Sequence, residues 1–463
     1  MRDTKSDDLF EEFQAVSAKQ WVQQIQVDLK GADYNQTLLW HSEEGIDVKP
    51  FYHEDTTPNK YNIPGQPDTW QIAQAIFIDD IAIAKKLLQE ALQKGATALR
   101  LIADKPFDIK AFFDGLIIEN AKIYFELLFW DQAFLHELSS YLNKNKSNYS
   151  LGLDPIGHLA KEGNWQNETN TIDALADIAK AEPKSSIRVD TRTYQNAGAN
   201  MVQQLAYAMC HANEYLHSLN KKGVPLKDLK VVFHIAIGSN YFFEIAKLRA
   251  LRLLYATLAK EYNANPLCEI LAMPTKRNKT IYDYNVNMLR TTTECMSAIL
   301  GGANTIENMP YDAVFHKDNP FGSRIARNQL LILKEESFFD KVSNPSDGTY
   351  YIENLTEELA NKALELFKNI EKSGGFIKQL HEGTIQRKIA ESAAKEQALF
   401  DSGKLVLLGT NKHPNPQDRM KEDLELFPFV KRNVRKTLFP PIIENRLAET
   451  LEQKRLEEEK TQA

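Results

Sequence analysis

The chain has few cysteines and no clustered histidines, which excludes the usual disulfide and metal frameworks. Its 463 residues include three cysteines, an odd number with no C-x-x-C spacing. Scattered cysteines of this kind are typical of reduced thiols. None of the ten histidines lies within four residues of another, so we expect no metal ligand set. We interpret Cys210, Cys268 and Cys295 as buried thiols of a cytoplasmic protein.

Long apolar runs and an excess of basic residues are also lacking. No run of about 18 apolar residues occurs, so we expect no membrane-spanning segment. The formal net charge is −7, and without clustered Lys and Arg a nucleic-acid partner is not expected. The charged start, MRDTKSDDLFEEF, does not look like a secretory signal. No G-x-x-x-x-G-K-[ST] is present, which argues against a P-loop.

Apolar, strand-like runs alternate with helical patterns from residue 72 onward. The runs lie at 72–78, 96–103, 122–129, 149–154, 186–190, 230–238, 268–273 and 303–308. No G-x-G-x-x-G follows any of them. Alternation over this length favours an α/β fold of the (β/α)8 TIM-barrel type over a doubly wound sheet. The first run is either a lead-in or one of the eight barrel strands.

We predict three parts along the chain. Residues 1–65 form an N-terminal helix and an extended arm, with Ser17 and Gln20 as a capping box. Residues 66–340 form the barrel, and residues 341–463 form a helical extension with a short strand at 404–409. The extension ends in a charged helix with a thin leucine stripe, for which a solvated tail is favoured over a docking strip.

Two features are open to a structural and a functional interpretation. His234 lies within an apolar strand, where a hydrogen-bonded core histidine is favoured over a ligand or a base. Four charged residues share one helix at spacings of three to five: Glu244, Lys247, Arg249 and Arg252. They form either ion pairs, an interface patch or a solvated face.

Five stretches, in this order, resemble the coenzyme-B12-dependent acyl-CoA mutases, and methylmalonyl-CoA mutase in particular. They are TRTYQNAGANMVQQLAYAM, GSNYFFEIAKLRALRLLYA, DYNVNMLRTTTECMSAILGGANTIENMPYDA, SRIARNQLLILKEESFFDKVSNPSDGTYYIENLTEELANKA and VLLGTNKH. The resemblance implies a barrel threaded by acyl-CoA and followed by a separate cobalamin domain. It also implies a radical rearrangement between methylmalonyl-CoA and succinyl-CoA, for which the cofactor supplies the radical.

The chain departs from this family where the chemistry takes place. Catalytic members carry a D-x-H-x-x-G cobalamin motif, and none of the histidines here has Asp two residues before it. We therefore expect no cobalamin-binding domain. The resemblance marks six barrel-mouth positions: Ala73 and Ala75 replace Arg and Tyr, Arg192 and Thr193 replace Tyr and His, Glu307 replaces His, and Gln195 matches.

These replacements remove groups that would contact a substrate. An ionised Glu307 would repel an anionic acyl group and could not donate a hydrogen bond. Arg192 and Thr193 are interpreted as structural, with Arg192 pairing Asp190 or a neighbouring carboxylate. Segments with a packing role still match the family at 290–292, 324–328 and 348–351. The sequence thus predicts no catalytic residue and no metal ligand on this chain.

The resemblance is best to the small (β) subunit of a heterodimeric mutase that functions in propionate metabolism. It implies a large (α) catalytic subunit as partner, which binds the adenosylcobalamin of the complex, while this chain binds none. The alternative is an acyl-CoA mutase barrel that works with a separately encoded cobalamin-binding domain. Arg188, Arg192 and Glu307 would then form an altered specificity site. A third hypothesis is a regulator whose barrel still binds acyl-CoA.

Overall fold

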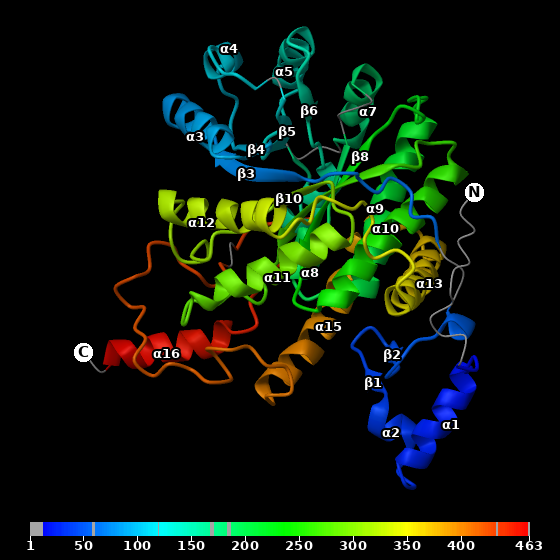
Figure 1. Cartoon of the computed structure of the whole chain (residues 1–463). Coiled ribbons are helices and arrows are strands. Elements are labelled where there is room, and N and C mark those ends of the chain that lie inside the picture. Colours follow the sequence, from blue (N-terminus) through cyan, green and yellow to red (C-terminus); the bar gives the residue numbers. More distant parts are fainter. Residues whose placement is uncertain are drawn as a thin grey trace, which may run out of the picture.

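The structure, a computed structural model, describes residues 13–57, 61–118, 120–166, 171–182, 187–431 and 434–461. Figure 1 shows a barrel of strands surrounded by helices, with an N-terminal arm that protrudes at the lower right and a C-terminal helix at the lower left.

Eight parallel strands form the barrel in the order β6-β5-β4-β3-β10-β9-β8-β7. They are β3 (Gln71–Phe77), β4 (Ala98–Ala103), β5 (Lys122–Leu127), β6 (Asn148–Ser150), β7 (Ile187–Asp190), β8 (Val231–Ile237), β9 (Cys268–Pro274) and β10 (Thr305–Glu307). Leu153, which follows β6, bridges Ile187 of β7 in parallel. The Arg188 N–H donates to the Leu153 carbonyl at 3.0 Å, so the barrel closes. The predicted fold is confirmed, and the run at 72–78 is a barrel strand.

Helices cover the outer face of the strands, which is why the strands are apolar runs rather than alternating ones. All seven residues of β8 are buried, for example. The surrounding helices are α3 (Ile81–Gln93), α4 (Ile109–Phe113), α5 (Gln132–Lys144), α6 (Pro155–Glu162), α7 (Ile172–Ala181), α8 (Arg192–Asn196), α9 (Met201–Lys221), α10 (Tyr241–Glu261), α11 (Val286–Leu300) and α12 (Pro320–Leu331), which continues as the π-helical turn η3 (Ile332–Glu336). Among the described helices, none is both long and apolar enough to cross a membrane.

The charged residues of α10 are buried, so a solvated face is the wrong interpretation of them. Glu244, Lys247, Arg249 and Arg252 are each at most 2% exposed. Lys247 Nζ lies 2.5 Å from Glu244 Oε2. Arg252 donates to the carbonyls of Cys268 and Gly302. The ion-pair hypothesis is thus confirmed for Glu244 and Lys247, whereas Arg252 anchors α10 through backbone carbonyls.

The arm contains more regular structure than the extended segment that we expected. It consists of α1 (Ala18–Asp28), α2 (Tyr34–Leu38), the hairpin of β1 (Trp40–His41) and β2 (Asp47–Val48), and η1 (Glu54–Thr56). The predicted capping box is present: Ser17 Oγ accepts from the Gln20 N–H at 3.2 Å, and Gln20 Oε1 accepts from the Ser17 N–H at 2.9 Å.

The extension is helical but lacks the short strand predicted at 404–409. Its helices are α13 (Tyr350–Lys372), α14 (Phe376–His381), α15 (Thr384–Asp401) and α16 (Glu449–Thr461). At 404–409 the hydrogen bonds that a partner strand would make come from one side chain. Asn411 accepts from the Leu407 N–H at 2.8 Å and donates to the carbonyls of Phe400 and Leu405.

The last helix docks on the body of the protein, so the interpretation as a solvated tail is wrong. Leu456 of α16 is 7% exposed, and Glu452 is fully buried. Just before it, Leu447 is buried and its N–H donates to the Arg277 carbonyl at 2.9 Å. The stripe that faces the protein includes glutamates, and a hydropathy pattern counts glutamates as solvated.

Candidate functional site

Four of the six barrel-mouth positions, Glu307 and the three in α8, lie at the carboxyl ends of strands, whereas Ala73 lies within β3. Ala73 and Ala75 lie in β3, and Glu307 ends β10, where it pairs in register with Ala73. Arg192, Thr193 and Gln195 lie in the short helix α8, directly after β7. In (β/α)8 proteins this end of the barrel carries the active site.

Glu307 forms a bidentate ion pair with an arginine that the sequence did not single out. Arg100 of β4 donates from Nε to Glu307 Oε2 at 2.7 Å and from Nη2 to Glu307 Oε1 at 2.6 Å. Arg100 and Glu307 are 8% and 7% exposed. The carboxylate is therefore neutralised within the protein rather than presented to a ligand.

The pairing continues across the barrel as a chain of five charged side chains, which we call the lumen network: Glu307, Arg100, Glu126, Arg192 and Asp190. Arg100 Nη1 donates to Glu126 Oε2 at 2.6 Å. Arg192 Nη2 donates to both oxygens of Glu126, at 3.1 and 3.0 Å, and Arg192 Nε donates to Asp190 at 2.8 Å. The predicted pairing of Arg192 with Asp190 is confirmed.

Electrostatics keep the lumen network ionised. Burial opposes the charge on Glu126, but Arg192, Arg100 and Arg188 outweigh burial and hold the pKa of Glu126 well below its ordinary value. Burial acts in the same way on Asp190, and the Arg192 guanidinium again outweighs it and lowers the pKa. With Arg188, whose Nη1 lies 3.8 Å from Glu126 Oε2, three arginines therefore compensate the three carboxylates of the lumen network.

The amino-terminal half of the lumen is filled as well. The Tyr124 hydroxyl from β5 donates to Glu269 of β9 and lies 2.8 Å from Thr305 Oγ1. Lys122 Nζ lies 3.3 Å from Glu269 Oε2. Tyr124 also packs in a small apolar cluster with Ala73. Burial, followed by the charge of Glu269, raises the pKa of Tyr124 well above its ordinary value, so its hydroxyl stays a donor.

Thr193 and Gln195 face structural partners rather than the lumen network. Thr193 Oγ1 donates to Glu444 at 3.3 Å. Gln195 accepts from Thr275 Oγ1 at 2.5 Å, in the loop that follows β9. Both side chains therefore hold α8 against other segments of the rim.

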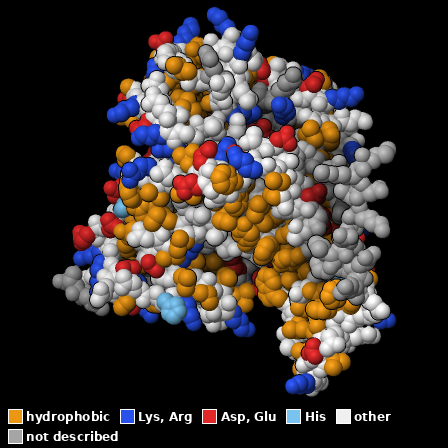
Figure 2. Space-filling view, in the orientation of Figure 1, with side chains coloured by type: hydrophobic (Ala, Val, Ile, Leu, Met, Phe, Trp, Pro, Cys, Tyr) orange, Lys and Arg blue, Asp and Glu red, His pale blue; other side chains and the backbone are white. Residues whose placement is uncertain are grey.

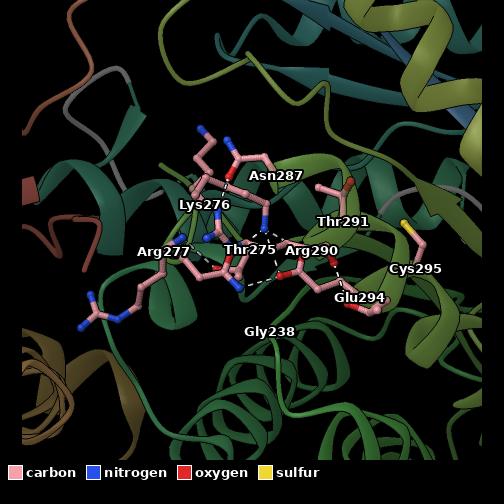
Figure 3. Close-up of polar contacts among 12 residues, drawn as sticks. Gly238, Thr275, Lys276, Arg277, Asn287, Arg290, Thr291, Glu294 and Cys295 are labelled. Atoms are coloured by element: carbon pink, nitrogen blue, oxygen red, sulfur yellow. Dashed lines mark hydrogen bonds and ion pairs between the residues drawn. The ribbon is translucent and has the colours of Figure 1, made fainter. Parts of the chain in front are cut away.

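The loop after β9 is bound to the first half and the middle of α11. Lys279 Nζ lies 2.7 Å from Glu294 Oε2, and both side chains are buried. Arg290 donates to Thr280 Oγ1 at 3.1 Å and to Asn287 Oδ1 at 2.8 Å. Figure 3 shows Asn287, Arg290 and Glu294 of α11 extending toward this loop. The rim is thus rigidly built, although it belongs to a barrel whose centre is filled.

His234 is the one histidine in the eight described strands of the barrel, and it does not fit a cobalt-ligating site. It is 1% exposed, as expected for a core histidine, although its Nδ1 has no hydrogen-bond partner. Burial, followed by the charges of Arg192 and Arg188, lowers its pKa well below the ordinary value. Among the described residues, no group of three His, Cys, Asp or Glu side chains could hold a metal ion.

Sequence reasoning missed Arg100 and Glu126, which link Arg192 to Glu307. A signal for them does exist: each is a charged residue inside an apolar strand, ALRLIA for Arg100 and KIYFEL for Glu126. Alternate residues of a barrel strand face the lumen, so such charges mark lumen positions. Arg100 and Glu307 are 207 residues apart, and no local pattern pairs them.

Comparisons with known proteins agree with these observations. The family described as methylmalonyl-CoA mutase matches residues 144–454. The chain is 32% identical to the methylmalonyl-CoA mutase small subunit of Porphyromonas gingivalis over 446 residues, which covers 89% of this chain and 72% of that protein. It is 28% identical to the methylmalonyl-CoA mutase of Rhizobium meliloti over 439 residues, 81% of this chain and 61% of that protein.

Solved structures give a weaker likeness. Dihydropteroate synthase from Yersinia pestis aligns with a TM-score of 0.32 at 10% identity, over 58% of this chain and 93% of that one. A likeness at this level supports no conclusion about function. The match over two thirds of the chain, together with the closed barrel, shows that this chain belongs to the methylmalonyl-CoA mutase family.

Proposed function

We propose that the chain is the small, non-catalytic subunit of a heterodimeric, adenosylcobalamin-dependent methylmalonyl-CoA mutase. The large subunit of that complex holds the cofactor and interconverts methylmalonyl-CoA and succinyl-CoA in cytoplasmic propionate metabolism. The lumen network carries the proposal, because paired charges occupy the place where the family binds its acyl group. Catalysis needs groups that interact more strongly with the transition state than with the ground state, and the five side chains of the lumen network already bind one another.

The role of this chain is then to bind and stabilise the large subunit. The arm supports this part of the proposal, because α1 buries one residue, Ala18, against its own chain. Trp21 and Val27 of α1 are 51% and 71% exposed. A helix of this length is marginal in water unless something packs on it, so we expect a partner surface to cover it.

The apolar surface of α1 continues onto the body of the protein through contacting aromatic rings. Tyr52 of the arm contacts Tyr351 of α13, with ring centroids 5.0 Å apart, and Tyr351 contacts Phe242 of α10 at 5.5 Å. Phe242 is 49% exposed. Figure 2 shows hydrophobic side chains gathered from the middle of this face down to the arm. We propose this arm-and-aromatic surface, defined by Trp21, Val27, Tyr52, Tyr351 and Phe242, as the contact with the large subunit.

Light scattering after size-exclusion chromatography tests the proposal. This chain is mixed with the catalytic large chain from the same source, and we expect one peak with the mass of a one-to-one complex. Two separate peaks would refute the subunit role.

An activity assay separates this function from the alternative. This chain alone, given adenosylcobalamin and methylmalonyl-CoA, should form no succinyl-CoA. Adding a stand-alone cobalamin-binding protein should not change that result. Turnover in either mixture would instead support a mutase barrel that borrows its cofactor.

A further inference from the structure

The C-terminal helix α16 is attached to the barrel mainly through carboxylates. Three residues of one stripe are buried, Glu452, Leu456 and Glu459, at spacings of four and three. Among these three, Leu456 is the one apolar residue. A helix usually docks through a broad apolar stripe, so α16 is held in an unusual way.

Each buried glutamate has specific partners on the seat of the helix. Glu459 accepts from the Tyr282 hydroxyl at 2.7 Å and from the N–H groups of Met420 and Lys421, both at 3.0 Å. Glu452 accepts from the Ile281 N–H at 2.9 Å.

Two arginines complete the attachment. Arg446 Nη1 lies 2.5 Å from Glu452 Oε2. The guanidinium of Arg455, on α16 itself, lies 3.9 Å from the centroid of the Tyr282 ring. The charges of α16 therefore meet defined partners on the barrel side.

The helix covers an apolar cluster that is separate from the main core. We call this cluster the seat: Ile281, Tyr282, Phe315, Met420 and Phe429, with Leu456 packed into it. Residues 281 and 282 belong to the loop after β9, and residue 315 follows β10. The seat therefore lies among the loops at the carboxyl end of the barrel, the end that (β/α)8 proteins use for binding.

The polar part of this attachment costs little to release. When α16 leaves, its glutamates, Arg446 and Arg455 regain water, and a buried ion pair gains little over its solvated partners. On α16 itself the apolar contribution comes from Leu456, and the apolar side chains of the seat that it covers add to the cost of release. Elements with few buried apolar contacts open more readily than the core of a domain.

We propose that α16 is a latch that detaches as a unit and uncovers the seat while the barrel stays folded. While the latch is attached, α16 of the same chain occupies the seat. The inference stands independently of the proposed subunit function, because it concerns contacts within one chain.

Hydrogen exchange followed by mass spectrometry on the full chain tests the latch. In the wild-type protein we expect the amides of α16 to exchange at least ~100-fold faster than those of α10 in the core. E459Q weakens three hydrogen bonds of the latch and should speed exchange in α16 and at residues 420–421 by a further ~10-fold. Y282F, which removes one of those bonds with little change in volume, should act in the same direction.

E457Q is the matched control, because it makes the same chemical change on the exposed side of α16 and should leave exchange unaltered. Exchange in α10 should be the same in all variants. Protection of wild-type α16 equal to that of α10 would overturn the proposal. So would an acceleration in E459Q and Y282F that extends equally to α10, since α16 would then open only with the whole fold.

Discussion

Breaking the ion pair between Arg100 and Glu307 should destabilise the barrel, and removing both partners should restore most of the loss. The two side chains form two hydrogen bonds of 2.7 and 2.6 Å and are at least nine-tenths buried. Removing one partner of such a pair costs about 3–5 kcal/mol, because the other charge stays buried without compensation. R100M leaves the buried Glu307 carboxylate without its partner in this way, and E307L leaves Arg100 paired with Glu126 alone.

The double variant R100M/E307L should cost much less than the sum of the two single changes. Apolar side chains of similar volume can replace a buried ion pair almost without loss, and Glu126 keeps its bonds to Arg192. We therefore expect the double variant to lose about 1–2 kcal/mol, against a sum of about 6–10 kcal/mol for the two single variants. The coupling between the two positions is the quantity that the lumen network predicts.

Thermal unfolding followed by circular dichroism measures this cycle. A chain of this length has an unfolding entropy near 1 kcal/mol/K, so each kcal/mol shifts the midpoint by about 1 °C. Each single variant should unfold about 3–5 °C below the wild type, and the double variant about 1–2 °C below it. E90Q is the control, because its pair with Lys94 is exposed and worth about 0–1 kcal/mol. Additive losses in the double variant would refute the argument that the two charges neutralise each other.

Three further predictions follow from the same structure. The pKa values of Glu126 and Asp190 in the folded protein lie below their ordinary values of 4.5 and 3.8. The stability that these carboxylates contribute to the fold is therefore complete above the ordinary values. It is lost as the pH falls through the lower, folded-state pKa values. Thermal midpoints should therefore hold from pH 7 to about pH 5 and fall below about pH 4, with a smaller fall in E126Q; an equal fall in E126Q would contradict this assignment. Burial raises the pKa of all three cysteine thiols. Ellman's reagent should therefore label none of them until guanidinium unfolds the protein. Labelling of the native protein would contradict this, because it would show that a thiol is accessible. On the arm-and-aromatic surface, F242S should weaken binding of the large chain by roughly tenfold or more in calorimetry. I83S, at a more exposed apolar position on α3, should not weaken it, and equal effects of the two would place the contact elsewhere.

The barrel could be predicted from the sequence because its strands bury both faces. Runs such as KVVFHIAIG and CEILAM are mostly apolar, and the helices between them have the length that parallel connections need. A strand prediction failed at 404–409, where the run is just as apolar. There the Asn411 side chain bonds the backbone groups of Leu407 and Leu405. The apolar pattern of a run does not show whether its backbone will pair with a strand or with a side chain.

Buried charges account for most of what the sequence did not reveal about the site and the extension. The local pairing of Arg192 with Asp190 was predictable, since the two residues are two positions apart. The partner of Glu307 and the burial of Glu452 depend on residues distant in the chain. Composition counts a glutamate as solvated, and contacts across the fold decide whether it is.

The lumen network also explains why the altered positions must be considered together. An isolated Glu307 in the barrel would carry the cost of an unpaired buried charge, and an isolated Arg100 would carry a similar one. Each becomes tolerable through the other, and Glu126 links that pair to Arg192 and Asp190. Replacing Glu307 alone by histidine, the residue that the family resemblance implies there, would leave Arg100 without its bidentate partner, and the other charges would remain in the lumen. The charged residues of the lumen are therefore coupled physically, because each buried charge depends on the partner that neutralises it.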